Sequence, residues 1–267
     1  MWLYHQEAGA GPAVVLLHAG ICDSRMWDPQ WVTFPRTQRT IRYDQRGYGS
    51  SPLPRGSWSD ARDLIGLLEE LGIRRAALVG VSRGGQIALE LAVARPDLVD
   101  ALVLVGAGLP GHDWSAQVRA SLAEEDAAVM RGDLDAAVEA NLRLWVDGPR
   151  RSAAGVDPAV RKLAAVMQRR VLELQAPVWE ALEDRIQLLV PDLAERLGQV
   201  RAPTLVLVGD QDVPDIHAIA ERLAREIGGA RQAVIDGAAH LPSLERPAEF
   251  DDLVLGFLAE VEGARST

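Results

Sequence analysis

The chain has 267 residues, of which 48% are hydrophobic, and a formal net charge of −10 at pH 7. This length and composition are sufficient for one large core, and the acidic balance argues against nucleic acid or an anionic membrane surface as a partner. A single cysteine, Cys22, excludes an internal disulfide and fits a reducing compartment, so we expect a cytoplasmic protein. Whether it is a monomer or a homodimer is left open by the sequence. Motifs for metal or dinucleotide binding are absent, and so is an apolar run of about 18 residues, so we expect no metal, no cofactor and no membrane span.

The first part of the chain, up to about residue 107, alternates short apolar runs with amphipathic segments. Met1–Glu7 can supply one strand, and a helix is predicted over Ser59–Leu71, with its leucines on the inner face. Further strands are predicted at Val14–Leu17, Thr40–Tyr43, Ala76–Gly80 and Ala101–Val105.

The middle of the chain, from about residue 112 to 198, contains no good strand. Helices are predicted there over Ser115–Met130, Leu134–Val146, Pro158–Leu174 and Pro177–Leu182. Strands resume at Thr204 and Ala233, and a last helix runs from Pro247 to about Val261. This alternation predicts an α/β fold with a mostly parallel sheet flanked by helices and right-handed crossovers. We expect residues 1–110 and 199–267 to form the core and residues 111–198 a helical cap inserted between strands.

A candidate nucleophile lies in Gly80-x-Ser82-x-Gly84, between the apolar run Ala76–Val79 and a helical segment from Gln86. A serine on so sharp a strand-to-helix turn has a strained backbone and an exposed hydroxyl, and glycines are needed because a Cβ would clash with the strand or helix. The alternative is an ordinary turn built from small residues, because this short pattern often occurs by chance.

A serine hydroxyl needs a base, and His240 is the best placed of five histidines, after an apolar strand and a glycine turn. The imidazole in turn needs a carboxylate to hold its tautomer. Asp210 and Asp212 follow the buried strand that begins at Thr204, and sites in open parallel sheets form beyond the carboxyl ends of the strands. Ser82, these acids and His240 can therefore converge at one edge of the sheet.

The order Ser82, Asp212, His240 resembles the nucleophile, acid and base order of the α/β-hydrolase superfamily. Four more segments resemble that superfamily, and together they span nearly the whole chain. Val14–Gly20 resembles its first strand and oxyanion loop, and Tyr43–Ser51 resembles its Asp-x-Arg-Gly-x-Gly-x-Ser turn. Gly209–Asp212 resembles its acid loop, and Gly237–Pro247 resembles its histidine loop. The Gly-x-x-Asp pattern of the acid loop favours Asp212 over Asp210 or Asp215. The chain is most similar to the serine-nucleophile branch of small esterases and 3-oxoadipate enol-lactone hydrolases.

The resemblance implies that the backbone N–H groups of Gly20 and Arg83 form the oxyanion hole. Two positions depart from the common pattern: Ala19 stands where glycine is frequent, and Arg83 follows the nucleophile. The Arg83 side chain is expected either to be packed or ion-paired beneath the site or to meet a substrate carboxylate. The N-terminus also offers one strand where relatives often have a hairpin. Candidate pocket residues are Cys22, Trp145, Trp179 and Leu241, for each of which plain packing is the alternative.

These features predict a carboxylic ester hydrolase, an esterase or lactonase, that acts on a small, partly apolar substrate through an acyl-enzyme on Ser82. Two rivals use the same three residues: a cofactor-free perhydrolase or haloperoxidase-like enzyme, and a C–C or hydroxynitrile lyase. A third is a ligand-binding module with little turnover, although a receptor has no need of a complete triad. Haloalkane dehalogenase and epoxide hydrolase activities are disfavoured because their nucleophile is an aspartate.

Overall fold

The computed structural model describes residues 3–265. Met1 and Trp2, which begin the predicted first strand, and residues 266–267, at the end of the predicted core, lie outside the described residues.

The centre of the molecule is a sheet that contains seven strands within residues 3–265, in the order β1-β3-β2-β4-β5-β6-β7. β1 is antiparallel to β3, and every other pair is parallel. The strands are β1 (His5–Ala8), β2 (Ala13–Leu17), β3 (Arg39–Tyr43), β4 (Ala76–Val81), β5 (Val99–Val105), β6 (Thr204–Gly209) and β7 (Arg231–Ile235). The predicted mostly parallel sheet is confirmed. Before β2 the described chain holds one edge strand rather than a hairpin.

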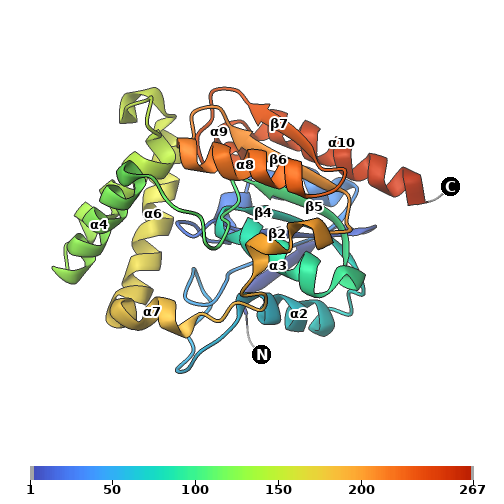
Figure 1. Cartoon of the computed structure of the whole chain (residues 1–267), viewed down its shortest axis with the longest axis horizontal. Coiled ribbons are helices and arrows are strands. Elements are labelled where there is room, and N and C mark those ends of the chain that lie inside the picture. The colour runs from blue at the N-terminus through green and yellow to red at the C-terminus, as the bar shows by residue number, and fades with distance from the viewer. Residues whose placement is uncertain (1–2, 266–267) are drawn as a thin grey trace.

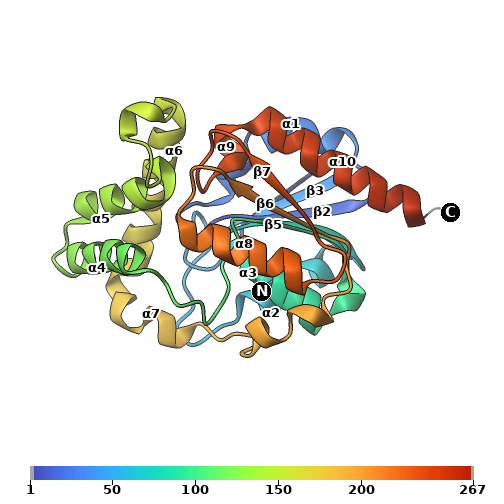
Figure 2. The ribbon, with the colours of Figure 1, turned by 45° about the horizontal axis from the view of Figure 1, so that its top comes forward.

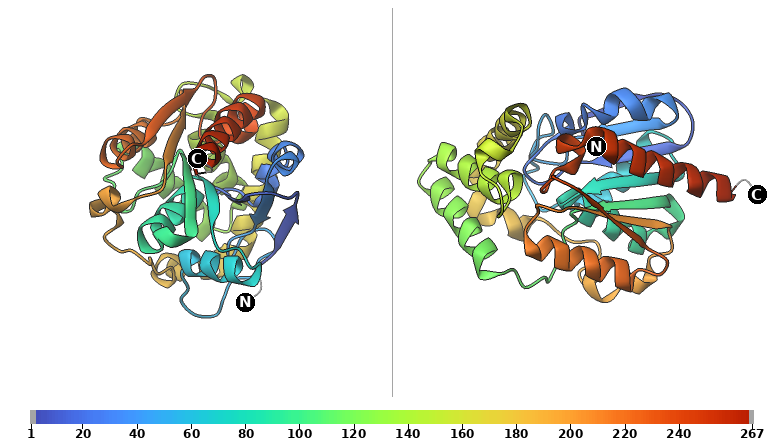
Figure 3. Two further views of the ribbon diagram at one scale, coloured as in Figure 1. Left: turned by 90° about the vertical axis from the view of Figure 1, so that its right-hand side faces the viewer. Right: turned by 90° about the horizontal axis from the view of Figure 1, so that it is seen from above.

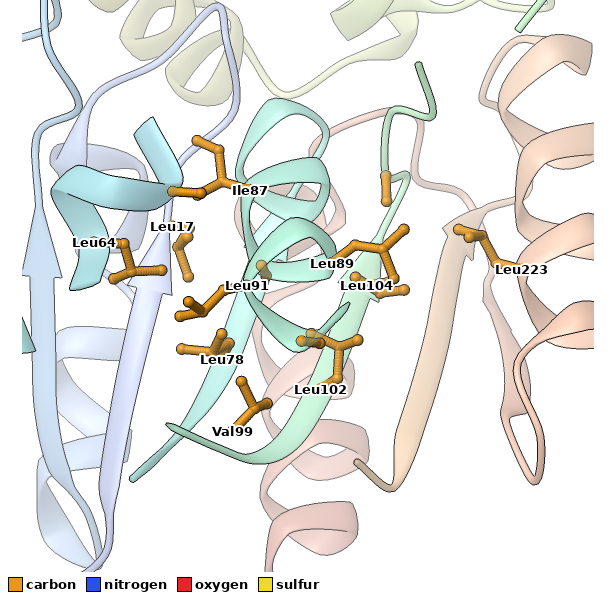
Figure 4. Close-up of a cluster of buried hydrophobic side chains, with 14 of the residues drawn as sticks. Leu17, Leu64, Leu78, Ile87, Leu89, Leu91, Val99, Leu102, Leu104 and Leu223 are labelled. Carbon is orange, nitrogen blue, oxygen red and sulfur yellow. The ribbon is translucent and has the colours of Figure 1, made fainter. Parts of the chain in front are cut away.

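The sheet is buried on both faces because its side chains alternate between two apolar clusters. In β2, Val15 and Leu17 face one cluster, whereas Val14 and Leu16 face the other. The first cluster packs against α2 (Asp60–Glu70), α3 (Arg83–Ala94) and α8 (Pro214–Glu226). Figure 4 shows members of this cluster: Leu17, Leu78 and Leu104 of the sheet, Leu64 of α2, Ile87 of α3 and, further to the right, Leu223 of α8. Continuous apolar strands of this kind are typical of parallel sheets with helices on both sides.

The opposite face is covered by α1 (Gln30–Thr33), α9 (Pro242–Glu245) and α10 (Pro247–Arg265), with Phe250 and Val254 among the fully buried side chains (Figure 2). The predicted last helix is therefore correct in place and longer by one turn. Among the helices of residues 3–265, none is both long and apolar enough to cross a bilayer.

The chain between β5 and β6 folds into helices that lie beside one end of the sheet (Figures 1 and 3). These are α4 (Ala116–Met130), α5 (Leu134–Asn141), α6 (Pro158–Gln175) and α7 (Trp179–Arg185). The predicted helix over Leu134–Val146 differs in one respect: it becomes a π-helix over Leu142–Asp147. Gly148 ends it at φ 75°, where a Cβ would overlap the Gln211 carbonyl oxygen. The π-helix is thereby fixed against the loop that carries Asp212.

Candidate active site

Ser82 occupies the turn between β4 and α3 with φ 53° and ψ −115°, and among residues 3–265 it is the one non-glycine residue with positive φ. Its N–H donates to the Val105 carbonyl at 2.9 Å, and its carbonyl accepts from the N–H groups of Gln86 and Gly108. A Cβ on Gly80 would overlap the Gly84 carbonyl, and one on Gly84 would overlap the Leu17 carbonyl. The turn is therefore over-determined by its surroundings, which is how a strained residue persists.

His240 and Asp212 form a buried pair next to this turn. The Nδ1 of His240 lies 2.7 Å from Oδ2 of Asp212, and both residues are only 2% exposed. The other carboxylate oxygen of Asp212 accepts from the Val213 N–H at 2.8 Å. A carboxylate on Nδ1 holds the proton there and leaves Nε2 free to act as the base. Gly106 makes room for the pair, because a Cβ on it would lie 3.2 Å from Nδ1 of His240.

The two neighbouring acids have other partners. Asp210 accepts from the Gly237 N–H at 2.6 Å and so ties the acid loop to the histidine loop. Asp215 accepts from the Ser115 N–H at 2.6 Å and lies 3.3 Å from Nε2 of His112, which joins the start of α4 to the core. Of these three acids, Asp212 is the one that contacts His240.

The π-helix supports His240 from the other side. The backbone N–H of His240 donates to the Trp145 carbonyl at 3.2 Å. The Trp145 ring packs on the imidazole, with centroids 4.5 Å apart and planes tilted by 34°. The inserted helices therefore contact the loop that carries His240 and hold it in place.

The loop that carries Gly20 is held by His18. Burial lowers the pKa of His18, and the neutral ring donates from Nδ1 to the Ala19 carbonyl (2.8 Å) and accepts at Nε2 from the Gln45 N–H (2.9 Å). Ala19 has a negative φ, so it fits where glycine is frequent. A Cβ built on Gly20 would lie 3.6 Å from Cβ of Arg83, so the two residues predicted to form the oxyanion hole are neighbours. Arg83 is the first residue of α3, where a helix N–H has no partner within the helix.

The Arg83 side chain is ion-paired, which is the first of the two roles expected for it from the sequence. Its guanidinium contacts the carboxylate of Asp60, donates from Nε to Oε1 of Gln45 at 3.1 Å and lies over the Tyr48 ring. Burial alone would lower the pKa of Arg83, but the negative charge of Asp60 outweighs it, so that the pKa is raised above its usual value. Since its charge is already matched, Arg83 is poorly suited to attract a substrate carboxylate.

A cavity of about 320 Å³ joins these parts. Ser82 and His240 line it together with Gly20 and Arg83, and of the candidate pocket residues Trp145 and Trp179 line it. Cys22 and Leu241 do not. They are fully buried in the apolar cluster that also contains Met167 of α6 and Phe250 of α10. Burial also raises the pKa of the Cys22 thiol well above its usual value, which keeps it unreactive.

A larger groove of about 770 Å³ lies between α6 and the loops after β2 and β3, and it contains neither Ser82 nor His240. Three of its four arginines pair with acids: Arg25 with Asp23, Arg42 with Asp28, and Arg169 with Asp135 and Glu173. The fourth, Arg170, donates to the Gly49 carbonyl. Within residues 3–265, no group of three or more His, Cys, Asp or Glu side chains is arranged to hold a metal ion. The smaller cavity is therefore the candidate active site.

Three polar residues of the cavity roof were missed by the sequence reasoning: Glu125 of α4, Asn141 of α5 and Gln168 of α6. A signal for the first exists, because Glu125 shares a helical stripe with Val118, Leu122 and Val129. An acid on an apolar stripe is either paired or exposed to a ligand.

Comparison with known proteins places these features in context. A family described as the alpha/beta hydrolase family matches residues 14–253. The chain is 28% identical to the pimeloyl-[acyl-carrier protein] methyl ester esterase of Nitrosospira multiformis over 93% of this chain and 95% of that protein. It is 27% identical to the 2-hydroxy-6-oxo-6-phenylhexa-2,4-dienoate hydrolase of Comamonas testosteroni, over 97% and 91%. The enol-lactonase of Burkholderia xenovorans LB400 has a similar structure, with a TM-score of 0.77, 26% identity and 96% coverage of both chains.

Proposed function

Because the chain belongs to the alpha/beta hydrolase family, we propose that it is a serine hydrolase that cleaves a carboxylic ester or lactone through an acyl-enzyme on Ser82. The observation that carries the proposal is the buried 2.7 Å pair of Asp212 and His240, with His240 lining the same cavity as Ser82. The methyl ester esterase and the enol-lactonase, to which the chain is similar, support an ester or lactone as the substrate.

The reaction follows from the roles that the geometry gives each group. Ser82 Oγ attacks the carbonyl carbon while Nε2 of His240 takes its proton, and the imidazolium that forms is stabilised by Asp212. The N–H groups of Gly20 and Arg83 stabilise the oxyanion, and the positive end of the α3 dipole acts at the same place. The C–O bond to the leaving alcohol then breaks as His240 returns the proton to it. Water, deprotonated by His240, releases the acid from Ser82.

The inserted helices have a part in this proposal. Residues 111–198 act as a cap that walls the cavity with Trp145 and Trp179 and sets which substrates enter, since the catalytic parts are generic. The cavity volume of about 320 Å³ suits a small substrate.

The experiment is the hydrolysis of p-nitrophenyl esters from acetate to decanoate, with simple lactones alongside, by the wild type and the Ser82→Ala and His240→Ala variants. The proposal expects wild-type turnover with an optimum at short acyl chains, and loss of turnover in both folded variants. Turnover in a variant at close to the wild-type kcat contradicts it. His217→Ala is a matched control, because His217 lies on α8, outside the cavity, and should leave the rate unchanged.

A further inference from the structure

The roof of the active-site cavity holds a cluster of polar groups on three different helices. Glu125, Asn141 and Gln168 are 9%, 4% and 2% exposed, and all three line the cavity. Gln168 donates from Nε2 to Oε1 of Glu125 at 3.3 Å, and the Asn141 amide donates from Nδ2 to the Ala137 carbonyl at 3.2 Å. We call these three residues the roof cluster. Placing three polar side chains among Leu122, Val171 and Leu172 is costly for the cap unless they have partners.

One atom of the roof cluster has no partner. Among residues 3–265, Oε1 of Gln168 is one of the buried side-chain oxygens with no hydrogen-bond donor in reach. Gln168 lines the cavity although this oxygen is itself closed to solvent, so a small turn of the amide would bring the oxygen within reach of a donor on a molecule bound there. The neighbouring Glu125 carboxyl is a second acceptor, and Nε2 of Gln168 already donates to one of its oxygens. The roof cluster therefore has acceptor oxygens that an N–H or O–H group of a bound molecule would satisfy.

The charges around the cavity restrict the ligand further. Glu125 and Glu183 line it from the cap, and the one cation of the lining, Arg83, is paired with Asp60. Glu183, and Glu125 when it is ionised, disfavour an anionic substrate group, and a plain alkyl chain leaves Oε1 of Gln168 unsatisfied.

We propose that the roof cluster is a specificity subsite that binds a neutral hydrogen-bond donor, an amide N–H or a hydroxyl, at the end of the acyl chain of the substrate. The inference rests on the proposed function, because the acyl chain is the part that stays bonded to Ser82 beneath the roof. The substrate is thus an ester or lactone of a polar, uncharged acid. This narrows the expected small, partly apolar substrate to one whose acyl chain ends in a polar, uncharged group.

The test uses two esters that differ in one group. The p-nitrophenyl esters of 5-amino-5-oxopentanoic acid and 5-oxohexanoic acid have the same length and the same chain carbonyl, but the first ends in NH₂ where the second ends in CH₃. The proposal expects kcat/KM of the wild type to be about tenfold higher for the amide ester, the size of one net hydrogen bond to a buried acceptor. Equal values for the two esters overturn it.

Variants assign the preference to the roof cluster. Gln168→Met keeps the length of the side chain and removes both polar atoms, so the amide-to-ketone ratio of kcat/KM should fall to about one. Glu125→Gln should lower the ratio only in part, because it retains one acceptor. Val171→Ala is the matched control: it lies one turn further along α6 and lines the same cavity, so it should change both rates and leave the ratio at the wild-type value. A Gln168→Met variant with the wild-type ratio overturns the assignment.

Failure of the inference is distinguishable from failure of the proposed function. If both esters are hydrolysed at equal rates and Ser82→Ala is inactive, the function stands and the subsite does not. If neither ester is hydrolysed, the binding of pentanamide and of 2-hexanone to the wild type is followed by the fluorescence of the cavity tryptophans, Trp145 and Trp179. Tighter binding of the amide, lost in Gln168→Met, supports the subsite without any turnover, and equal binding overturns it.

Discussion

Replacing Ser82 with glycine should make the protein more stable than replacing it with alanine, although both variants are inactive. At φ 53° and ψ −115° an alanine retains the backbone strain of the serine, whereas glycine adopts these angles freely. Holding a non-glycine residue in such a sparsely populated region costs about 1–3 kcal/mol. Glycine gives back about 0.4–1 kcal/mol through the greater freedom of the unfolded chain. The balance favours Ser82→Gly over Ser82→Ala by about 1 kcal/mol.

Thermal and urea unfolding of the two variants at pH 7 measure this difference. For a chain of this size, about 1 kcal/mol corresponds to a difference of roughly 2–4 °C in Tm. Ser57, which is exposed and has an ordinary φ, provides the control pair. There Ser57→Gly should be less stable than Ser57→Ala, so that the sign reverses between the two sites. A Ser82→Gly variant that is less stable than Ser82→Ala refutes the claim that strain is stored at the nucleophile.

Three further predictions concern the groups around Ser82. Asp212→Asn should keep the fold and lower kcat by about 10³–10⁴-fold, because an amide permits the wrong tautomer of His240. A loss below tenfold in a steady-state assay would contradict the role of Asp212. Trp145→Ala should lower kcat by up to about tenfold. Trp145→Phe should lower it by much less, since phenylalanine preserves the stacking on His240. Equal losses of kcat in the two variants would show that stacking is not the cause. Burial, with a smaller contribution from Asp126, raises the pKa of Glu125 from 4.5 to about 7, so its contribution to stability is present below pH 4.5 and is lost as the pH rises through 7. The free energy of unfolding in urea should therefore be the same for Glu125→Gln and the wild type at pH 5, and higher for Glu125→Gln by up to about 3 kcal/mol at pH 8.5. A difference between the two proteins that does not change with pH would disprove the raised pKa of Glu125.

The local motifs of the chain were informative because each fixes its own stereochemistry. Gly80 and Gly84 flank Ser82 because neither position has room for a Cβ, and this constraint is visible in the sequence before any tertiary contact is known. The apolar runs indicate the central strands β2, β4, β5 and β6, since strands covered on both faces are almost continuously apolar. Both signals led to the fold, which the structure and the family match confirm.

Side-chain direction and helix packing were beyond the reach of the sequence. Cys22 and Leu241 adjoin the loops of Gly20 and His240 along the chain, yet their side chains point into the core. The roof cluster is assembled from three helices whose relative placement no local pattern encodes. The π-helix that brings Trp145 onto His240 likewise reads as a continuation of α5, because its residues are as apolar as those before it.

The most direct measurement of the central claim is the covalent labelling of the nucleophile. The protein is incubated with an activated organophosphate ester such as diethyl p-nitrophenyl phosphate, which transfers its diethylphosphoryl group to an activated serine and releases p-nitrophenol. Intact-mass spectrometry and peptide mapping then locate the adduct. The account predicts one adduct, on Ser82, that is absent from Ser82→Ala and slowed strongly in His240→Ala. A wild-type protein that stays unlabelled, or that is labelled equally in Ser82→Ala, would contradict the assignment of Ser82 as the nucleophile.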